Sequence, residues 1–91
     1  MTTMPTYYLI ASAAGVDALI AAETALADAG LVVTSFADYL TYERAIPALL
    51  DADAVGLVDG WESSPGARSQ AELAAAFGKT VLEVSDLLAL V

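Results

Sequence analysis

The sequence predicts a small α/β domain built on a parallel four-stranded sheet, and three observations support this fold class. Short apolar segments at residues 7–11, 31–35, 54–58 and 80–84 have the composition of buried strands. Helical patterns separate these segments, and every connection is short. Such alternation is typical of a parallel sheet with helices on both faces. We expect one Rossmann-like or flavodoxin-like domain over residues 1–91, with strand order 2-1-3-4.

The first helix is expected over residues 16–29. Four apolar residues fall near one stripe of this segment, with Glu23 and Asp28 off it. The stripe residues are Val16, Leu19, Ile20 and Leu26. Gly30 follows, and a glycine there is typical of a helix C-terminus because it adopts a left-handed backbone without steric cost. At the other end of the chain, residues 85–91 are expected to form a short terminal helix or tail.

The second helix is expected over residues 43–52, after an ambiguous segment at residues 36–42. Pro47 is awkward inside a helix, so either the helix begins near Pro47 or it kinks there. Tyr39 and Tyr42 of the ambiguous segment could reach a pocket. Packing in the core or at an interface is the more common fate of such residues.

The third helix is expected to cover residues 71–77, and two starting points compete. Ser64 followed by Pro65 would place proline at the first helical position, where its missing N–H is not needed. Ser69 lies three residues before Glu72, which is the spacing of a capping box. The local sequence leaves both starts open.

Composition excludes several classes of function. Twelve acidic residues against three basic ones give a net charge of −9, which repels nucleic acid and anionic lipid. A ligand with a single phosphate is still compatible with this net charge, since one helix N-terminus and one arginine can hold it. Cysteine and histidine are absent, which excludes disulfides, thiolate nucleophiles, ordinary zinc sites and Ser-His-Asp triads. No dinucleotide-binding glycine motif and no P-loop is present, and we expect neither a metal nor a cofactor.

The apolar content bears on location and assembly. No apolar run approaches the roughly 20 residues of a membrane span, and the N-terminus lacks the basic segment of a signal peptide. We therefore expect a cytoplasmic protein. Hydrophobic residues make up 58% of the chain, which is more than so small a core can bury. A homo-oligomer, a dimer or larger, is expected for this reason.

The loop at residues 59–70, between the third strand and the third helix, is the best candidate for a site. A Gly/Ser-rich turn before a helix N-terminus presents unpaired N–H groups and a partial positive charge. The first strand also ends in a turn of small residues, and the strand order reverses between these two strands. Both turns should border one crevice. The expected ligand-binding residues are Ala11, Ser12, Asp59, Gly60, Trp61, Ser64, Gly66, Arg68 and Gln70.

Several of these residues also have a purely structural interpretation. Gly60, Ser64 and Gly66 could cradle a phosphate or a ribose, or they could form a turn and cap a helix. Trp61 could stack on a nucleobase, although a tryptophan at a strand end more often seals the edge of a core. Ser12 could bind a ligand or cap the first helix.

Charged residues near the loop are equally ambiguous. Arg68 could bind phosphate, or it could pair with Glu72 four residues later as a solvated ion pair. Asp51, Asp53 and Asp59 resemble a metal-binding cluster in the sequence. Aspartates that flank a strand are more often turn residues with solvated charges.

Four motifs in the C-terminal half indicate a family. They are residues 49–55 (LLDADAV), 60–68 (GWESSPGAR), 72–74 (ELA) and 78–81 (GKTV). Together they resemble the nucleoside 2-deoxyribosyltransferase-like superfamily, and in particular a small branch common in phages and bacteria. The resemblance covers residues 49–84, and the N-terminal half matches only in layout. It implies the fold expected above and an activity that cleaves or exchanges the N-glycosidic bond of deoxynucleosides or their monophosphates.

The chain departs from this family where the resemblance would place catalysis. In the family a glutamate after the glycine loop attacks the anomeric carbon or supports its positive charge. Gln70 stands at that position, and an amide has the shape of the carboxylate without its charge. Ala45 stands where many relatives have an aspartate, and Ala11-Ser12 replaces a glycine-proline pair. Glu72 is about 200° around the helix from Gln70 and should face away from the crevice.

These observations lead to three hypotheses on function. The first is a domain that binds a nucleoside, a nucleotide or a related ribosyl ligand without efficient catalysis, because the family glutamate is missing. The second is an active deoxyribosyltransferase or deoxynucleotide N-hydrolase that uses Glu72 or a carboxylate from a partner subunit. The third is a phage-type protein-interaction module with a vestigial pocket. The expected partner under the first hypothesis is a small molecule, with no nucleic acid and no membrane.

Overall fold

A single sheet of four parallel strands, in the order β2-β1-β3-β4, forms the centre of the computed structural model. The model describes residues 5–12, 15–35 and 42–90. The α/β class and the strand order are as predicted. The strands are β1 (Thr6–Ile10), β2 (Val32–Ser35), β3 (Ala54–Leu57) and β4 (Thr80–Glu83).

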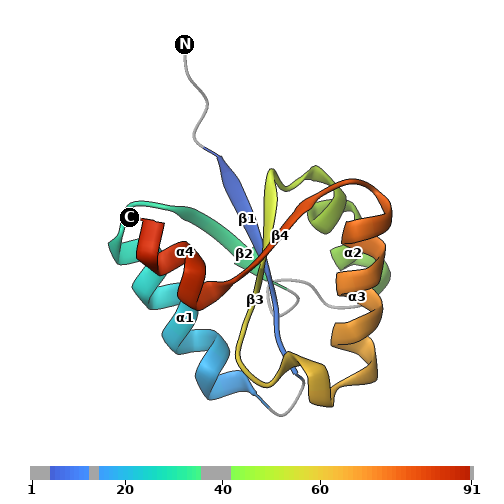
Figure 1. Ribbon diagram of the computed structural model, residues 1–91, viewed down its shortest axis with the longest axis horizontal. Helices are drawn as coiled ribbons and strands as arrows, with labels where there is room; N and C mark the ends of the chain where they lie inside the picture. Colours follow the sequence, from blue (N-terminus) through green and yellow to red (C-terminus); the bar gives the residue numbers. More distant parts are fainter. Residues whose placement is uncertain (1–4, 13–14, 36–41, 91) are drawn as a thin grey trace.

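Helices cover both faces of the sheet, which gives three layers (Figure 1). The first and last helices lie on one face, called here the α1/α4 face, and the middle two lie on the other, called the α2/α3 face. No helix within the described ranges is long and apolar enough to cross a membrane. The helices are α1 (Val16–Asp28), α2 (Tyr42–Asp51), α3 (Pro65–Ala76) and α4 (Val84–Leu90), with a 3-10 turn η2 (Trp61–Ser63) before α3.

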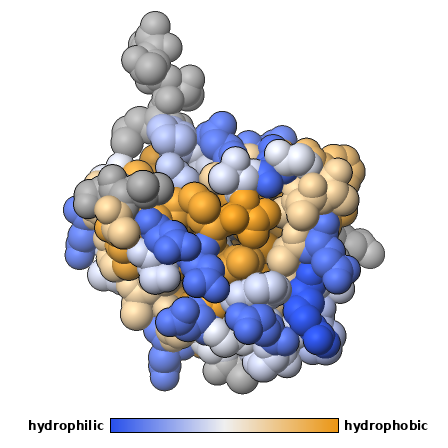
Figure 2. Space-filling view, viewed as in Figure 1, coloured by the Kyte–Doolittle hydropathy of each residue, from blue (hydrophilic) through white to orange (hydrophobic). Residues whose placement is uncertain are grey.

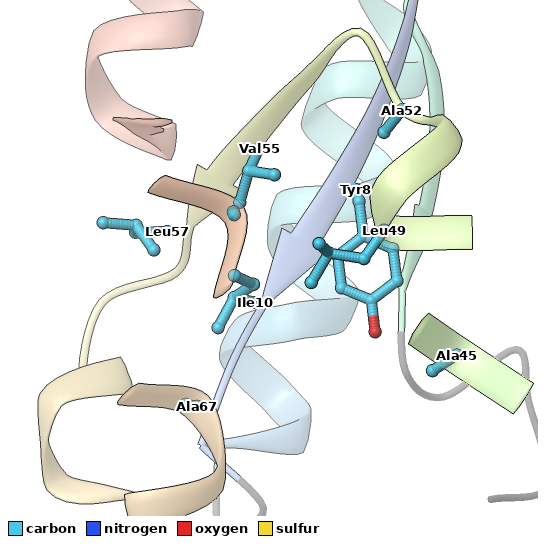
Figure 3. Packing of buried hydrophobic residues seen from close by; sticks show 9 residues of the cluster. Tyr8, Ile10, Ala45, Leu49, Ala52, Val55, Leu57 and Ala67 are labelled. Carbon is cyan, nitrogen blue, oxygen red and sulfur yellow. The ribbon is translucent and has the colours of Figure 1, made fainter. Parts of the chain in front are cut away.

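Alternation along the strands divides the core between the two faces. On β1, Tyr8 and Ile10 belong to the α2/α3 cluster, whereas Leu9 belongs to the α1/α4 cluster. Figure 3 shows Tyr8 and Ile10 beside Leu49 of α2, Ala67 of α3 and other residues of the first cluster. The sheet is therefore buried on both sides, as its near-continuous apolar strands predicted.

Gly30 ends α1 as predicted. Its backbone adopts φ +89°, and the N–H of Leu31 donates to the carbonyl of Leu26 at 3.1 Å. This bond closes a Schellman-type end, which needs a left-handed residue. Gly78, with φ +74°, follows α3 in the same way, so two of the three helix-to-strand turns depend on a glycine backbone.

Helix α2 runs through Pro47 without a break in its helical backbone. The alternative in which the helix begins near Pro47 is therefore wrong, since α2 begins at Tyr42. Proline in a helix interior removes one hydrogen bond. Packing outweighs this loss, because α2 buries Ala45 and Leu49 completely against the sheet while Pro47 is exposed.

Helix α3 begins at Pro65, which confirms the predicted start with proline at the first helical position. Ser64 is the N-cap, and its Oγ accepts a hydrogen bond from the N–H of Ala67 at 3.4 Å. The capping-box start is wrong, since Ser69 and Glu72 lie inside the helix with exposed side chains. The 3-10 turn η2 that precedes α3 was not predicted.

Some predictions fall outside the described residues. They concern Tyr39 with the rest of residues 36–41, and the side chain of Tyr42. Near the C-terminus, α4 begins directly after β4, one residue earlier than predicted.

Candidate functional site

The turns after β1 and β3 lie side by side at the carboxyl end of the sheet. Ile10 and Leu57 are paired in register across β1 and β3, and the N–H of Val58 donates to the carbonyl of Ile10 at 2.9 Å. Ser12 and Asp59 follow these last paired residues by two positions each. The structure therefore brings together the two turns that were expected to border one crevice.

The turn after β3 is built around Gly60. Its φ of +90° is a conformation that residues with a side chain rarely adopt. The Gly60 carbonyl accepts from the N–H of Ser63 at 3.2 Å and from its Oγ at 2.8 Å. These bonds close the η2 turn, so Gly60 has a structural role whatever it does for a ligand.

The N-terminus of α3 offers few free donors. Pro65 has no N–H, and the N–H of Ala67 is taken by Ser64 Oγ. The N–H of Gly66 makes no hydrogen bond with any described residue. Gly66 has an ordinary backbone conformation, and a Cβ added to it would come no closer than 3.9 Å to Ser64 Oγ. The fold does not require glycine at this position, because an added Cβ would make only an ordinary van der Waals contact.

Gln70 lies on the buried side of α3, between Ala67 and Ala74, and is only 5% exposed. Side chains on a helix lean toward its N-terminus, which for α3 is the crevice end of the sheet. Within the described part of the chain, no hydrogen bond joins the Gln70 amide to another residue. Glu72 lies on the exposed side of the same helix.

Trp61 seals the edge of the core, which was its structural interpretation. Its ring packs against the α2/α3 cluster. The indole Nε1 is nevertheless buried and has no hydrogen-bond partner among the described residues. Trp61 in the η2 turn and Gln70 in the following helix α3 therefore each carry a polar group without a partner among the described residues.

Two structural interpretations fail. Ser12 does not cap α1, because the N-cap is Gly15 and no side chain caps this helix. The Ser12 carbonyl instead accepts from the N–H of Gly15 at 2.8 Å. Arg68 and Glu72 are both exposed and form no ion pair in the described structure. The guanidinium of Arg68 is therefore available to a ligand.

The aspartates do not form a metal site. No group of three acidic residues within the described ranges is placed to hold a metal ion. Asp53 is a turn residue: its Oδ2 accepts from the Thr6 N–H at 2.7 Å and from Thr6 Oγ1 at 3.3 Å. These bonds join the starts of β1 and β3, at the edge of the sheet opposite the crevice.

A hollow between α1 and α4, which the sequence did not suggest, extends the site region. Its volume is about 270 Å³, and Val58 and Asp59 after β3 line one side of it. The α1 side of the hollow is formed by alanines. Their small side chains on one side of the helix were the signal by which the sequence could have indicated the hollow. The other lining residues are Ala18, Ala21, Ala22, Val84, Ser85 and Leu88.

Comparison with known proteins identifies a family and no characterised relative. No curated protein and no solved structure matches the chain. One family model matches residues 11–83, from the residue after β1 to the end of β4. The match therefore includes the turn after β3 and helix α3, and it leaves out α4. The chain belongs to this family, which is described as a domain of unknown function (DUF4406).

Proposed function

We propose that the protein binds a nucleoside, a nucleotide or a related ribosyl ligand at the carboxyl ends of β1 and β3, and that it turns this ligand over poorly or not at all. The observation that carries the proposal is the Gln70 amide, which is 5% exposed and has no partner among the described residues. The resemblance of the C-terminal half to the deoxyribosyltransferase-like superfamily supplies the ligand class.

Energetics support a ligand at this position. A buried polar group without a partner costs about 1–3 kcal/mol, and native structures pair the great majority of such groups. This cost applies in full to the Trp61 Nε1, which is fully buried without a partner, and only in part to the Gln70 amide, whose atoms are not among the fully buried ones. A ribose hydroxyl or a base edge supplies donors and acceptors to both. Binding of such a ligand would satisfy groups that the fold leaves unsatisfied.

Weak turnover follows from the same residue. Among the described residues no carboxylate is buried, so none lies buried beside Gln70. Glu72 is exposed on the far side of α3 and is poorly placed to replace the family glutamate. Loss of a charge that stabilises the transition state lowers rates by factors of roughly 100 to 1,000.

Ligand binding is tested by a thermal-shift screen against deoxynucleosides, their monophosphates, ribose phosphate and nicotinamide dinucleotide. A ligand at about 100 times its Kd stabilises the fold by about 2.7 kcal/mol, which raises Tm by at least several degrees for so small a domain. The shift should be lost in Gln70→Ala and kept in Glu72→Ala, an exposed position on the same helix. No shift with any ligand would contradict the proposal and favour the protein-interaction module.

Turnover is tested by release of free base from the deoxynucleosides and their monophosphates. The protein itself should release base at or near the uncatalysed rate, and Gln70→Glu should release it roughly 100-fold faster or more. Burial raises the pKa of an introduced carboxyl group, so the assay should include pH values above neutral. Efficient release by the protein itself, abolished in Glu72→Gln, would establish the enzyme hypothesis instead.

We also propose that copies of the chain associate. Hydrophobic residues gather in the middle of the face shown in Figure 2, where Figure 1 places β4, and one edge of β4 has no strand beside it. Light scattering should give at least the mass of a dimer, and a monomer at all concentrations would contradict this. The large hydrophobic side chains that are exposed in the described part are Val16, Ile20, Val32, Phe77 and Leu88.

A further inference from the structure

The carboxyl-terminal edge of the sheet is strongly acidic. Arg68, in the first turn of α3, is the cation at this edge whose side chain the structure describes. Arg44 belongs to the first turn of α2, which begins at the same edge. Lys79 precedes β4 and therefore lies at the opposite edge. Even if both arginines are counted, carboxylates outnumber cations at this edge. The exposed carboxylates there are Asp17, Asp59, Glu62, Glu83 and Asp86.

The first turns of α1, α3 and α4, as far as the structure describes them, do not form an anion site. Phosphate sites in α/β folds use several backbone N–H groups at a helix N-terminus. In α3, Pro65 has no N–H and Ser64 Oγ occupies that of Ala67, so the N–H of Gly66 is left. The first turns of α1 and α4 carry Asp17 and Asp86, and a carboxylate in the first turn offsets the positive end of a helix.

Apart from the exposed Arg68, the polar groups of the site that lack a partner among the described residues are uncharged. The amide of Gln70 can donate and accept, and the indole N–H of Trp61 can donate. Both can pair with a hydroxyl or with the edge of a base. Neither group compensates the charge of a phosphate, and bringing an uncompensated charge into a partly buried site is unfavourable.

From this balance we infer that the crevice binds an uncharged nucleoside in preference to the corresponding 5′-monophosphate. The inference rests on the proposed function and narrows its ligand class. Electrostatic repulsion between the acidic edge and the phosphate is the cause, so the preference depends on ionic strength.

Isothermal titration calorimetry with the four common deoxynucleosides and their 5′-monophosphates tests this inference. At about 0.01 M ionic strength, where the screening length is about 30 Å, the nucleoside that binds best should bind roughly tenfold tighter than its monophosphate. At about 0.15 M, where the screening length is about 8 Å, the ratio of the monophosphate Kd to the nucleoside Kd should be smaller. A monophosphate that binds as well or better at low salt would overturn the inference and leave the proposed function intact.

A charge variant tests whether electrostatic repulsion or steric exclusion of the phosphate causes the preference for the nucleoside. Glu62→Gln removes an exposed carboxylate next to the loop and should narrow the ratio by roughly two- to fivefold at low salt, with nucleoside affinity unchanged. Asp28→Asn is the matched control, because it removes the same charge at the far end of α1. A ratio that does not respond to salt or to Glu62→Gln would overturn the inference. No binding by any nucleoside or monophosphate would overturn the proposed function as well.

Discussion

The two faces of the sheet treat their buried polar side chains differently. On the α1/α4 face, Ser35 is fully buried and its Oγ donates to Oε1 of Glu23 on α1 at 2.8 Å. On the α2/α3 face, Gln70 is nearly as buried and has no partner among the described residues. Stability explains the first arrangement, since the pair ties β2 to α1. Stability does not explain the second, and we interpret Gln70 as a group kept for a ligand.

The surrounding packing shows the same contrast. Leu9, Leu26 and Leu87 fill the α1/α4 face with aliphatic side chains, while the α2/α3 face carries the buried Nε1 of Trp61. Substitutions of these three leucines should therefore change stability alone. Substitutions at the polar groups of the second face should separate stability from binding.

The largest expected effect is that of Leu26→Ala on the α1/α4 face. Leu26 is fully buried, and loss of its side chain leaves a cavity that should cost about 2–5 kcal/mol of unfolding free energy. Urea unfolding measures this loss. Ligand affinity, measured where the variant is folded, should be unchanged. A cost below about 1 kcal/mol would show that this face is not the main source of stability.

A smaller loss is expected from Gly56→Ala on β3. An added Cβ would lie 2.9 Å from Leu9 Cδ2 and 3.0 Å from Leu87 Cδ1, both in the α1/α4 core. Overpacking of this kind costs about 1–3 kcal/mol, and thermal unfolding measures it. Gly66→Ala is the control, because its Cβ would make only an ordinary van der Waals contact, 3.9 Å from Ser64 Oγ. Equal stability of the two variants would mean that the core yields around Gly56.

The sharpest test of the comparison uses one substitution on each face. Gln70→Met keeps the length of the side chain and removes the unpaired amide, so it should leave the stability of the fold unchanged or raise it slightly and weaken ligand binding. Ser35→Ala should destabilise it by about 1 kcal/mol, because Glu23 loses its hydrogen bond. Denaturant unfolding compares the two. A loss of stability in Gln70→Met would remove the argument that the amide is kept for function.

The smallest effect is expected at the start of α3. Ser64→Ala removes the cap, and because the bond to Ala67 is long at 3.4 Å, the loss should be about 0.5–1 kcal/mol. Ser69→Ala, an exposed change inside the same helix, should leave Tm unchanged or raise it slightly. The reverse order of the two Tm values would favour the capping-box start.

Most of the fold could be predicted because its signals are local. Strand composition, helical periodicity and the stop at Gly30 each depend on a few neighbouring residues. The strand order followed from general rules for parallel sheets, and so did the placement of Ser12 and Asp59 at one edge. The errors arose where two local signals were equally good, as with Ser64 and Ser69, or where packing outweighed propensity, as with Pro47.

By itself, the sequence determined the fold class, the order of the elements and the segments that meet at the crevice, because these depend on periodicity and on the direction of parallel strands. The tertiary structure alone decided which groups lie buried without a partner. Neither the unpaired amide of Gln70 nor the contacts around Gly56 follows from neighbours in sequence. Each depends on helices and strands distant in the chain that pack against the same sheet, and only the folded chain brings them together.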